Sequence, residues 1–132
     1  MNVVDSSAWL EYLAGSAGAE PFARVVENPD QLIVPTLCIF EIFKRVLHQR
    51  SEHEALQAVA AMLQGKVIDM DTRIAMEAAR LSIENDLPLA DSVIYATAKQ
   101  HHATLWTQDA HFNGLEGVEY HAKESNKMTK KM

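Results

Sequence analysis

Four acidic side chains stand where folding can gather them at one place: Asp5, Glu41, Asp91 and Asp109. Asp5 directly follows two valines, and Asp109 comes shortly after residues 104–107; both runs are typical of short buried strands. Ligands of an open α/β sheet bind beyond the carboxyl ends of its strands, so we expect both carboxylates at that edge. Glu41 lies about one to two turns into a predicted helix and Asp91 in the first turn of another, so both can lean over the same edge.

Carboxylates that crowd together need a positive partner, because neighbouring like charges raise each other's pKa or destabilise the fold. Hard oxygen ligands without paired histidines or cysteines favour Mg²⁺ or Mn²⁺ over zinc. We therefore hypothesise that the four acids hold one or two such ions, which activate a water for in-line attack on a phosphodiester. Ser6, Ser7 and Thr107 are candidates for orienting the carboxylates or their waters.

Each acid also has a purely structural interpretation. An acid in the first turn of a helix interacts favourably with the helix dipole, which by itself accounts for Asp91. Glu41 and Arg45 are spaced as an i,i+4 pair, which is typical of a surface salt bridge. The metal site is thus one interpretation of the acids, and separate structural roles are the other.

The elements that must position the acids alternate along the chain. Strands are predicted at 3–4, 32–34, 67–70, 104–107 and 118–120. Helices are predicted at 8–13, 21–26, 36–50, 51–63 and 72–85 and around 91–98. This alternation favours a single-domain three-layer α/β/α fold with a mostly parallel sheet of four to five strands. We assign residues 1–122 to this domain and residues 123–132 to a flexible lysine-containing tail.

Local signals support several helix boundaries. Ser51 and Glu54 match a capping box, Asp71 or Thr72 can cap the next helix, and Thr36 can cap the helix that carries Glu41. In that helix, apolar residues at core-like spacing predict a buried face: Ile39, Phe40, Phe43, Val46 and Leu47.

Composition limits the class of protein. With 132 residues, 48% of them hydrophobic and 23% charged, the chain has a globular composition with room for a core. The formal net charge of −6 argues against a broad basic surface for nucleic acid, although divalent cations at the acids would offset part of it. The lone Cys38 is expected to be a buried apolar residue, and without a visible signal peptide or membrane span we expect a reducing cytoplasm.

Four sequence blocks, each with one of the acids, follow one another over nearly the whole chain: Val4-Asp5-Ser6-Ser7, Glu41 in its helix, the segment 89–98 around Asp91, and Thr107-Gln108-Asp109-Ala110-His111-Phe112. In these blocks the chain resembles a PIN domain, specifically the VapC-type toxins of bacterial and archaeal toxin-antitoxin pairs. The resemblance implies a single-strand-directed endoribonuclease that depends on Mg²⁺ or Mn²⁺ and is usually a homodimer held inactive by a cognate antitoxin.

The same resemblance assigns roles to individual residues. It implies that Asp5, Glu41, Asp91 and Asp109 form the acidic site, with Thr107 and Ser7 as polar support. Where some relatives place a further acid, this chain has His111 and Asn113.

Two further surfaces have open interpretations. Lys44 and Arg45 are candidates for contacts with RNA phosphates as well as ordinary surface charges. A face formed by Trp9, Tyr12 and Leu13 with Phe40 and Phe43 is either core or a groove for an antitoxin segment.

Two other functions compete with the nuclease. A phosphoacceptor receiver domain also has acids at the tips of a small parallel sheet; Asp69 or Asp71 can serve as its acceptor, but a lysine directly after the last strand is missing. The other competitor is a catalytically silent PIN-fold module that only binds a partner, against which the four intact acids argue.

Overall fold

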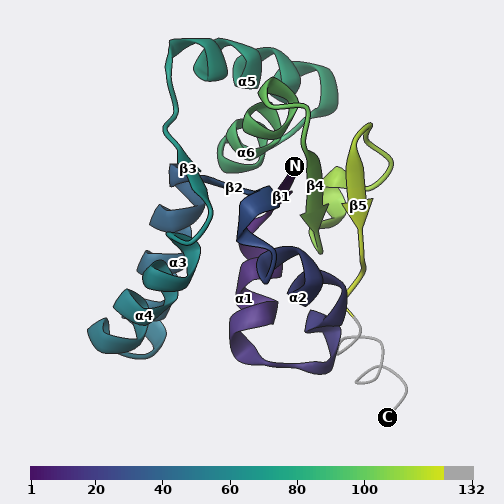
Figure 1. The fold of residues 1–132 in the computed structure, drawn as a ribbon. Helices are drawn as coiled ribbons and strands as arrows, with labels where there is room; N and C mark the ends of the chain where they lie inside the picture. Colours follow the sequence, from purple (N-terminus) through teal and green to yellow (C-terminus); the bar gives the residue numbers. More distant parts are fainter. Residues whose placement is uncertain (124–132) are drawn as a thin grey trace.

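The computed structural model describes residues 1–123 and contains one five-stranded parallel sheet in the order β3-β2-β1-β4-β5 (Figure 1). Its strands are β1 (Asn2–Val4), β2 (Leu32–Pro35), β3 (Lys66–Ile68), β4 (Thr104–Thr107) and β5 (Val118–Tyr120). The strand order reverses between β1 and β4, because β2 and β3 lie on one side of β1 and β4 and β5 on the other. The predicted α/β class is confirmed, and the reversal is the topological switch point where such sheets bind ligands.

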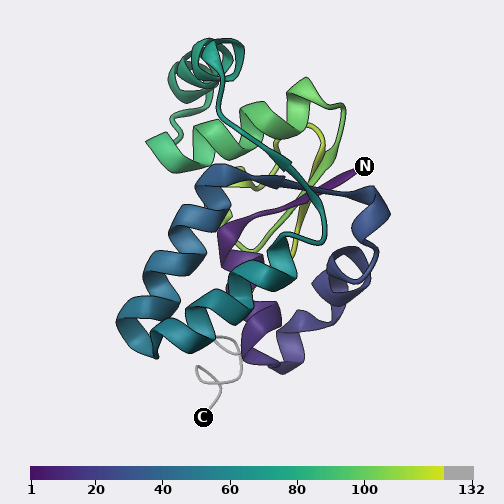
Figure 2. The same ribbon diagram turned by 60° about the vertical axis from the view of Figure 1, so that its left-hand side comes forward.

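Six α-helices connect the strands and cover both faces of the sheet. They are α1 (Ser6–Ala14), α2 (Glu20–Val26), α3 (Thr36–Gln49), α4 (Glu52–Met62), α5 (Thr72–Asn85) and α6 (Leu89–Gln100). Short 3₁₀ turns complete the connections: η1 (Ala17–Ala19), η2 (Pro29–Gln31) and η3 (Ala110–Phe112). In Figure 2, α5 and α6 lie above the sheet and α1, α2 and α4 below it, so the predicted three layers are present.

Several helix boundaries follow from the predicted local signals. The Ser51 hydroxyl accepts a hydrogen bond from the backbone N–H of Glu54, and the Asp71 carboxylate accepts one from Ile74, so both predicted caps are confirmed. The predicted Thr36 cap is wrong. Thr36 is already the first residue of α3, and Pro35 stands at the capping position without a side-chain hydrogen bond.

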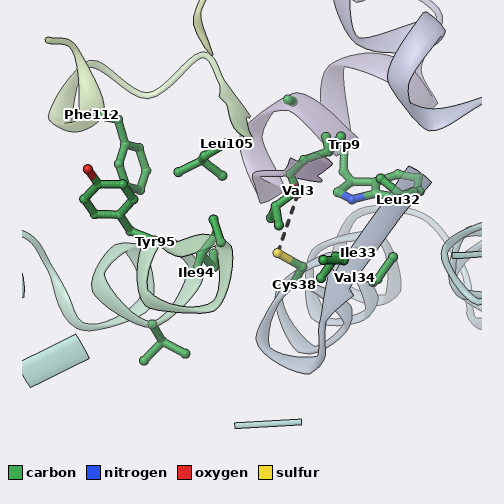
Figure 3. Close-up of a cluster of buried hydrophobic side chains, with 14 of the residues drawn as sticks. Val3, Trp9, Leu32, Ile33, Val34, Cys38, Ile94, Tyr95, Leu105 and Phe112 are labelled. Atoms are coloured by element: carbon green, nitrogen blue, oxygen red, sulfur yellow. Dashed lines mark hydrogen bonds between the residues drawn. The ribbon is translucent and has the colours of Figure 1, made fainter. Parts of the chain in front are cut away.

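The apolar core lies on both faces of the central strands. Figure 3 shows Val3 of β1 and Leu105 of β4 with residues from α1, α3 and α6 around them. Trp9 and Cys38 are fully buried, and the Cys38 thiol lies 3.7 Å from the carbonyl oxygen of Val4. Cys38 is therefore the buried apolar residue that its neighbours in the sequence predict, and it anchors α3 against β1.

The predicted buried face of α3 is partly wrong. The fully buried residues of this helix are Cys38 and Ile42, whereas Phe40 is 59% exposed and Leu47 is 44% exposed. Apolar residues occupy more of the circumference of α3 than the sheet and α4 can cover. Periodicity identifies an apolar stripe, but neighbouring elements decide which part of it becomes core.

Two predictions about the chain as a whole have different outcomes. Within residues 1–123, no helix has both the length and the apolar character needed to cross a membrane. The predicted tail at 123–132 lies outside the described residues except for Lys123, so the division after residue 122 stays a prediction.

Candidate active site

Asp5 lies directly after β1 at the switch point and is only 3% exposed. Its backbone N–H donates to the carbonyl of Trp106 at 2.9 Å, which continues the pairing of β1 with β4 by one residue. The hydroxyls of Thr107 and Ser7 donate to its carboxylate Oδ2 at 2.8 Å and 3.0 Å. The predicted support of Asp5 by these hydroxyls thus matches the observed contacts, and it fixes the orientation of the carboxylate.

Thr107 connects the buried acid to the next one along the edge. It is completely buried at the end of β4, and its hydroxyl oxygen accepts the backbone N–H of Asp109 at 2.9 Å while donating to Asp5. Asp109 in turn caps the η3 turn, because its Oδ1 accepts the backbone N–H of His111 at 2.9 Å. One hydroxyl therefore sets the positions of two acids from neighbouring strands.

Asp91 and Asp109 meet through a histidine. The His111 Nδ1 lies 2.8 Å from Asp109 Oδ1 and 3.1 Å from Asp91 Oδ2. A ligand atom from each of these three residues lies within 4.8 Å of the other two. Their side chains are more open than Asp5, with exposed fractions of 14% for Asp91, 26% for Asp109 and 56% for His111.

A hydrogen bond from α1 holds Glu41 near the other acids. The Ser6 hydroxyl, at the first residue of α1, donates to Glu41 Oε1 at 2.6 Å. The alternative i,i+4 pair of Glu41 with Arg45 is not among the ion pairs found within residues 1–123. Ser6 thus has the predicted orienting position, although the carboxylate it contacts is that of Glu41.

Burial and crowding together raise the pKa of two acids. Burial is the main cause that raises the pKa of Asp5 to about 6, and the Asp109 charge adds to it against the lowering effect of the hydrogen bonds. Burial also raises the pKa of Asp91 to about 7, followed by the charges of Asp109 and Asp5. The charge of Asp109 therefore raises the pKa of both acids, and the charge of Asp5 also raises that of Asp91, which places Asp5, Asp91 and Asp109 in one electrostatic cluster.

All four acids line one groove of about 1690 Å³ between α1, α3 and α4. We call Asp5, Glu41, Asp91 and Asp109 the acid cluster. Basic side chains line the groove as well: Lys44, Arg45, His48, Arg50 and Lys123. Apart from Thr107, which is buried behind Asp5, every sequence-predicted site residue thus lines one groove, and Asp91 and Asp109 lie within ligand distance of each other.

The acid cluster suits a divalent cation. Carboxylate oxygens are the ligands that Mg²⁺ and Mn²⁺ prefer, and Mn²⁺ accepts an imidazole nitrogen more readily than Mg²⁺ does. The raised pKa values of Asp5 and Asp91 show that the protein's own groups do not neutralise these carboxylates fully. Among the described residues, Asp91, Asp109 and His111 form the group that could hold the ion most directly.

His111 is the site residue that sequence reasoning missed. Only its place in the last sequence block was noted, without a role. The signal was the Asp109-x-His111 spacing after a strand, which lets the turn of η3 fold the imidazole back onto the acid.

The sheet order also decides between the competing folds. A receiver domain of the flavodoxin-like type has the strand order 2-1-3-4-5. This chain has β3 at the sheet edge and β1 in the centre, so Asp69 and Asp71 follow an edge strand, away from the switch point. The receiver interpretation is therefore wrong.

Comparison with known proteins agrees with this architecture of a parallel α/β sheet with acids at its switch point. The family model of the PIN domain matches residues 3–118. The chain therefore belongs to the PIN domain family. A search of curated proteins gives no significant match.

Solved structures with the same fold come from toxin-antitoxin systems. A toxin-antitoxin complex from Klebsiella pneumoniae superposes with a TM-score of 0.80 at 22% identity, over 93% of this chain and 100% of that chain. VapC20 of Mycobacterium tuberculosis, a sarcin-ricin loop cleaving toxin, superposes with a TM-score of 0.73 at 16% identity, over 88% of this chain and 95% of VapC20. VapBC2 of Rickettsia felis, bound to a promoter DNA fragment, superposes with a TM-score of 0.72 at 12% identity, over 92% of this chain and 97% of that chain. At these identities the similarity concerns the fold.

Proposed function

We propose that the chain is a VapC-type toxin, an endoribonuclease that depends on Mg²⁺ or Mn²⁺. The observation that carries the proposal is the convergence of Asp5, Asp91 and Asp109 at the switch point of a PIN-domain sheet. The toxin-antitoxin origin of several structures with this fold supports the biological role. A homodimer in the cytoplasm, with one or two ions in each site, is what the resemblance leads us to expect.

The proposed mechanism assigns a separate task to each part of the acid cluster. Asp91, Asp109 and His111 would hold the ion, with Asp5 and Glu41 completing its negative surroundings. A bound ion supplies a Lewis acid that lowers the pKa of a water and balances charge on the phosphodiester. Ser6, Ser7 and Thr107 keep the carboxylates oriented, so the site needs little rearrangement when substrate arrives. Lys44 and Arg45, exposed on the groove wall, would hold neighbouring phosphates.

An antitoxin would bind along the part of the groove farther from the acids. Leu13 lies about two turns beyond Ser6 in α1, and Leu47 nearly two turns beyond Glu41 in α3. Both are partly exposed and line the groove. Of the face that the sequence leaves open between core and groove, Leu13, Phe40 and Phe43 line the groove, whereas Trp9 is fully buried in the core. A peptide seated there would block the approach to the acid cluster.

RNA cleavage with added metal tests the proposal. The purified chain is incubated with a folded RNA in Mn²⁺, in Mg²⁺ and in EDTA, and the ends of the fragments are sequenced. We expect cleavage with either ion, none in EDTA, and 5′-phosphate ends, because water is the proposed nucleophile. Fragments with 2′,3′-cyclic phosphates would contradict the route by water. Metal binding without any cleavage would instead favour the catalytically silent PIN-fold module.

A further inference from the structure

An exposed aromatic ring stands beside the acid cluster. Phe40 directly precedes Glu41, lines the same groove, and is 59% exposed. Among the large apolar side chains that are exposed in residues 1–123, it is the only aromatic one. A ring with this exposure, in the groove that holds the acid cluster, is free to pack against a ligand that enters the groove.

The groove around Phe40 has a distinct charge pattern. The Lys44 ammonium lies 5.6 Å from the centre of the Phe40 ring. Arg45 and Lys123 also line this groove, in a protein whose formal net charge is −6. Six acidic side chains line the groove as well: Asp5, Glu11, Glu41, Glu54, Asp91 and Asp109. A polyanion in this groove therefore gains most at the basic group beside the Phe40 ring.

We propose that Phe40 is a stacking platform for an unpaired nucleobase next to the scissile phosphate, and that Lys44 contacts a phosphate of the same strand. The inference rests on the proposed function and adds two residues that would bind the base and the backbone of the substrate. An aromatic ring flanked by basic groups is the arrangement that holds single-stranded nucleic acid, since every base has a face that can stack.

The stacking platform has a consequence for substrate choice. Within a duplex both faces of a base are covered by neighbouring bases, so an inner base cannot lie on Phe40 without leaving its stack. The Phe40 side chain keeps 59% of its surface exposed although the Lys44 ammonium lies 5.6 Å from the ring centre, so surface remains for a base. The stacking platform thus gives the single-strand preference that the family resemblance implies a physical basis in one residue.

Fluorescence of a modified base tests the stacking directly. A single-stranded RNA with 2-aminopurine beside the cleavage position is titrated with Asp5→Asn protein, which keeps the strand intact, with and without Phe40→Leu. We expect Phe40→Leu to weaken RNA binding about tenfold and to abolish the change in fluorescence that stacking produces. Phe40→Tyr should keep both. Leu56→Ala is the matched control, because Leu56 is an exposed apolar residue of α4 that does not line the groove.

The possible outcomes separate this inference from the proposed function. Unchanged binding and fluorescence in Phe40→Leu, with the wild-type chain still cleaving RNA, would overturn the stacking platform alone. If the variant keeps its RNA affinity but no longer binds an antitoxin, Phe40 contacts protein and the platform is again rejected. Absence of RNA cleavage by the wild-type chain in any metal would count against the nuclease itself.

Discussion

Asp5 and the pair Asp91 and Asp109 form a buried half and an open half of the acid cluster, and different kinds of partner hold them. Neutral hydroxyls from Thr107 and Ser7 fix Asp5 in a site that is only 3% exposed. An imidazole that is 56% exposed bridges Asp91 and Asp109. Thr107 is buried at the end of β4 and Ser7 lies in the first turn of α1, so both hydroxyls are held by regular structure, whereas an exposed ring can rotate. The buried half is therefore preorganised, and the open half can adapt to an ion or a substrate.

The largest effect is expected from removing the buried charge. Asp5→Asn keeps the size of the side chain but removes the negative charge. We expect RNA cleavage to fall more than about 100-fold, because losing the charged group costs more than losing the groups that orient it, for which about 10- to 100-fold is typical. Cleavage rates at saturating Mn²⁺ check this, and a loss below tenfold would mean that the buried half is dispensable.

A smaller loss is expected when Asp5 keeps its charge but loses its main hydroxyl partner. Thr107→Val removes the donor to Asp5 and the acceptor of the Asp109 N–H. We expect cleavage to fall about 10- to 100-fold. Ser7→Ala is the matched comparison, because Ser7 donates to the same oxygen of Asp5. Thr107 stays in place in this variant, so cleavage activity should fall less than in Thr107→Val. Equal losses in the two variants would show that Thr107 has no special connecting role.

A change in the open half should alter the relative affinities of the protein for Mn²⁺ and Mg²⁺. His111→Ala removes the only nitrogen ligand of the Asp91, Asp109 and His111 group. Both ions prefer oxygen ligands, but Mn²⁺ accepts an imidazole nitrogen more readily than Mg²⁺ does, so we expect Mn²⁺ affinity to fall about tenfold while Mg²⁺ affinity changes little. Calorimetric titration of the intact protein with each ion measures this. A parallel loss for both ions would assign His111 to orienting the acids instead.

The smallest effect concerns stability without metal. The raised pKa values of Asp5 and Asp91 mean that the folded protein binds protons more tightly than the unfolded chain. Their protonation contributes stability that is complete below the unfolded pKa of 3.8 and is lost as pH rises through about 6 to 7. We expect the Tm in EDTA to fall by several degrees over this range.

Asp91→Asn provides the control for this pH dependence. The variant should have a higher Tm than the wild type in EDTA at pH 7, a flatter pH profile, and a smaller rise in Tm on adding Mg²⁺. Identical pH profiles and identical metal responses in the two proteins would show that Asp91 does not share a crowded, metal-binding site.

The sequence places the acids at the ends of strands better than it places the histidine that bridges Asp91 and Asp109. Asp5 and Asp109 could be placed because they follow apolar strands, and the ends of parallel strands share an edge. The contact of His111 with Asp91 depends on how η3 turns back over α6, which no periodicity in the sequence encodes.

The order of strands and helices was predictable from local sequence patterns, but the exposure of individual side chains was not. Alternating strand and helix patterns identified the parallel sheet, and the short runs at 104–107 and 118–120 match β4 and β5. The exposed position of Phe40 was not predictable, because an apolar residue on α3 is core or groove depending on elements far along the chain. Side-chain chemistry and spacing determine each helix, but tertiary neighbours determine which of its faces meets water.

The hydrogen bond between Thr107 and Asp5 joins residues 102 positions apart in the sequence. Strand β1 leaves the ribosome well before its partner β4, because a long stretch of chain lies between them. The acid cluster therefore cannot assemble on a nascent chain until β4 has been made. Any activity of the proposed site is delayed until this late pairing has formed.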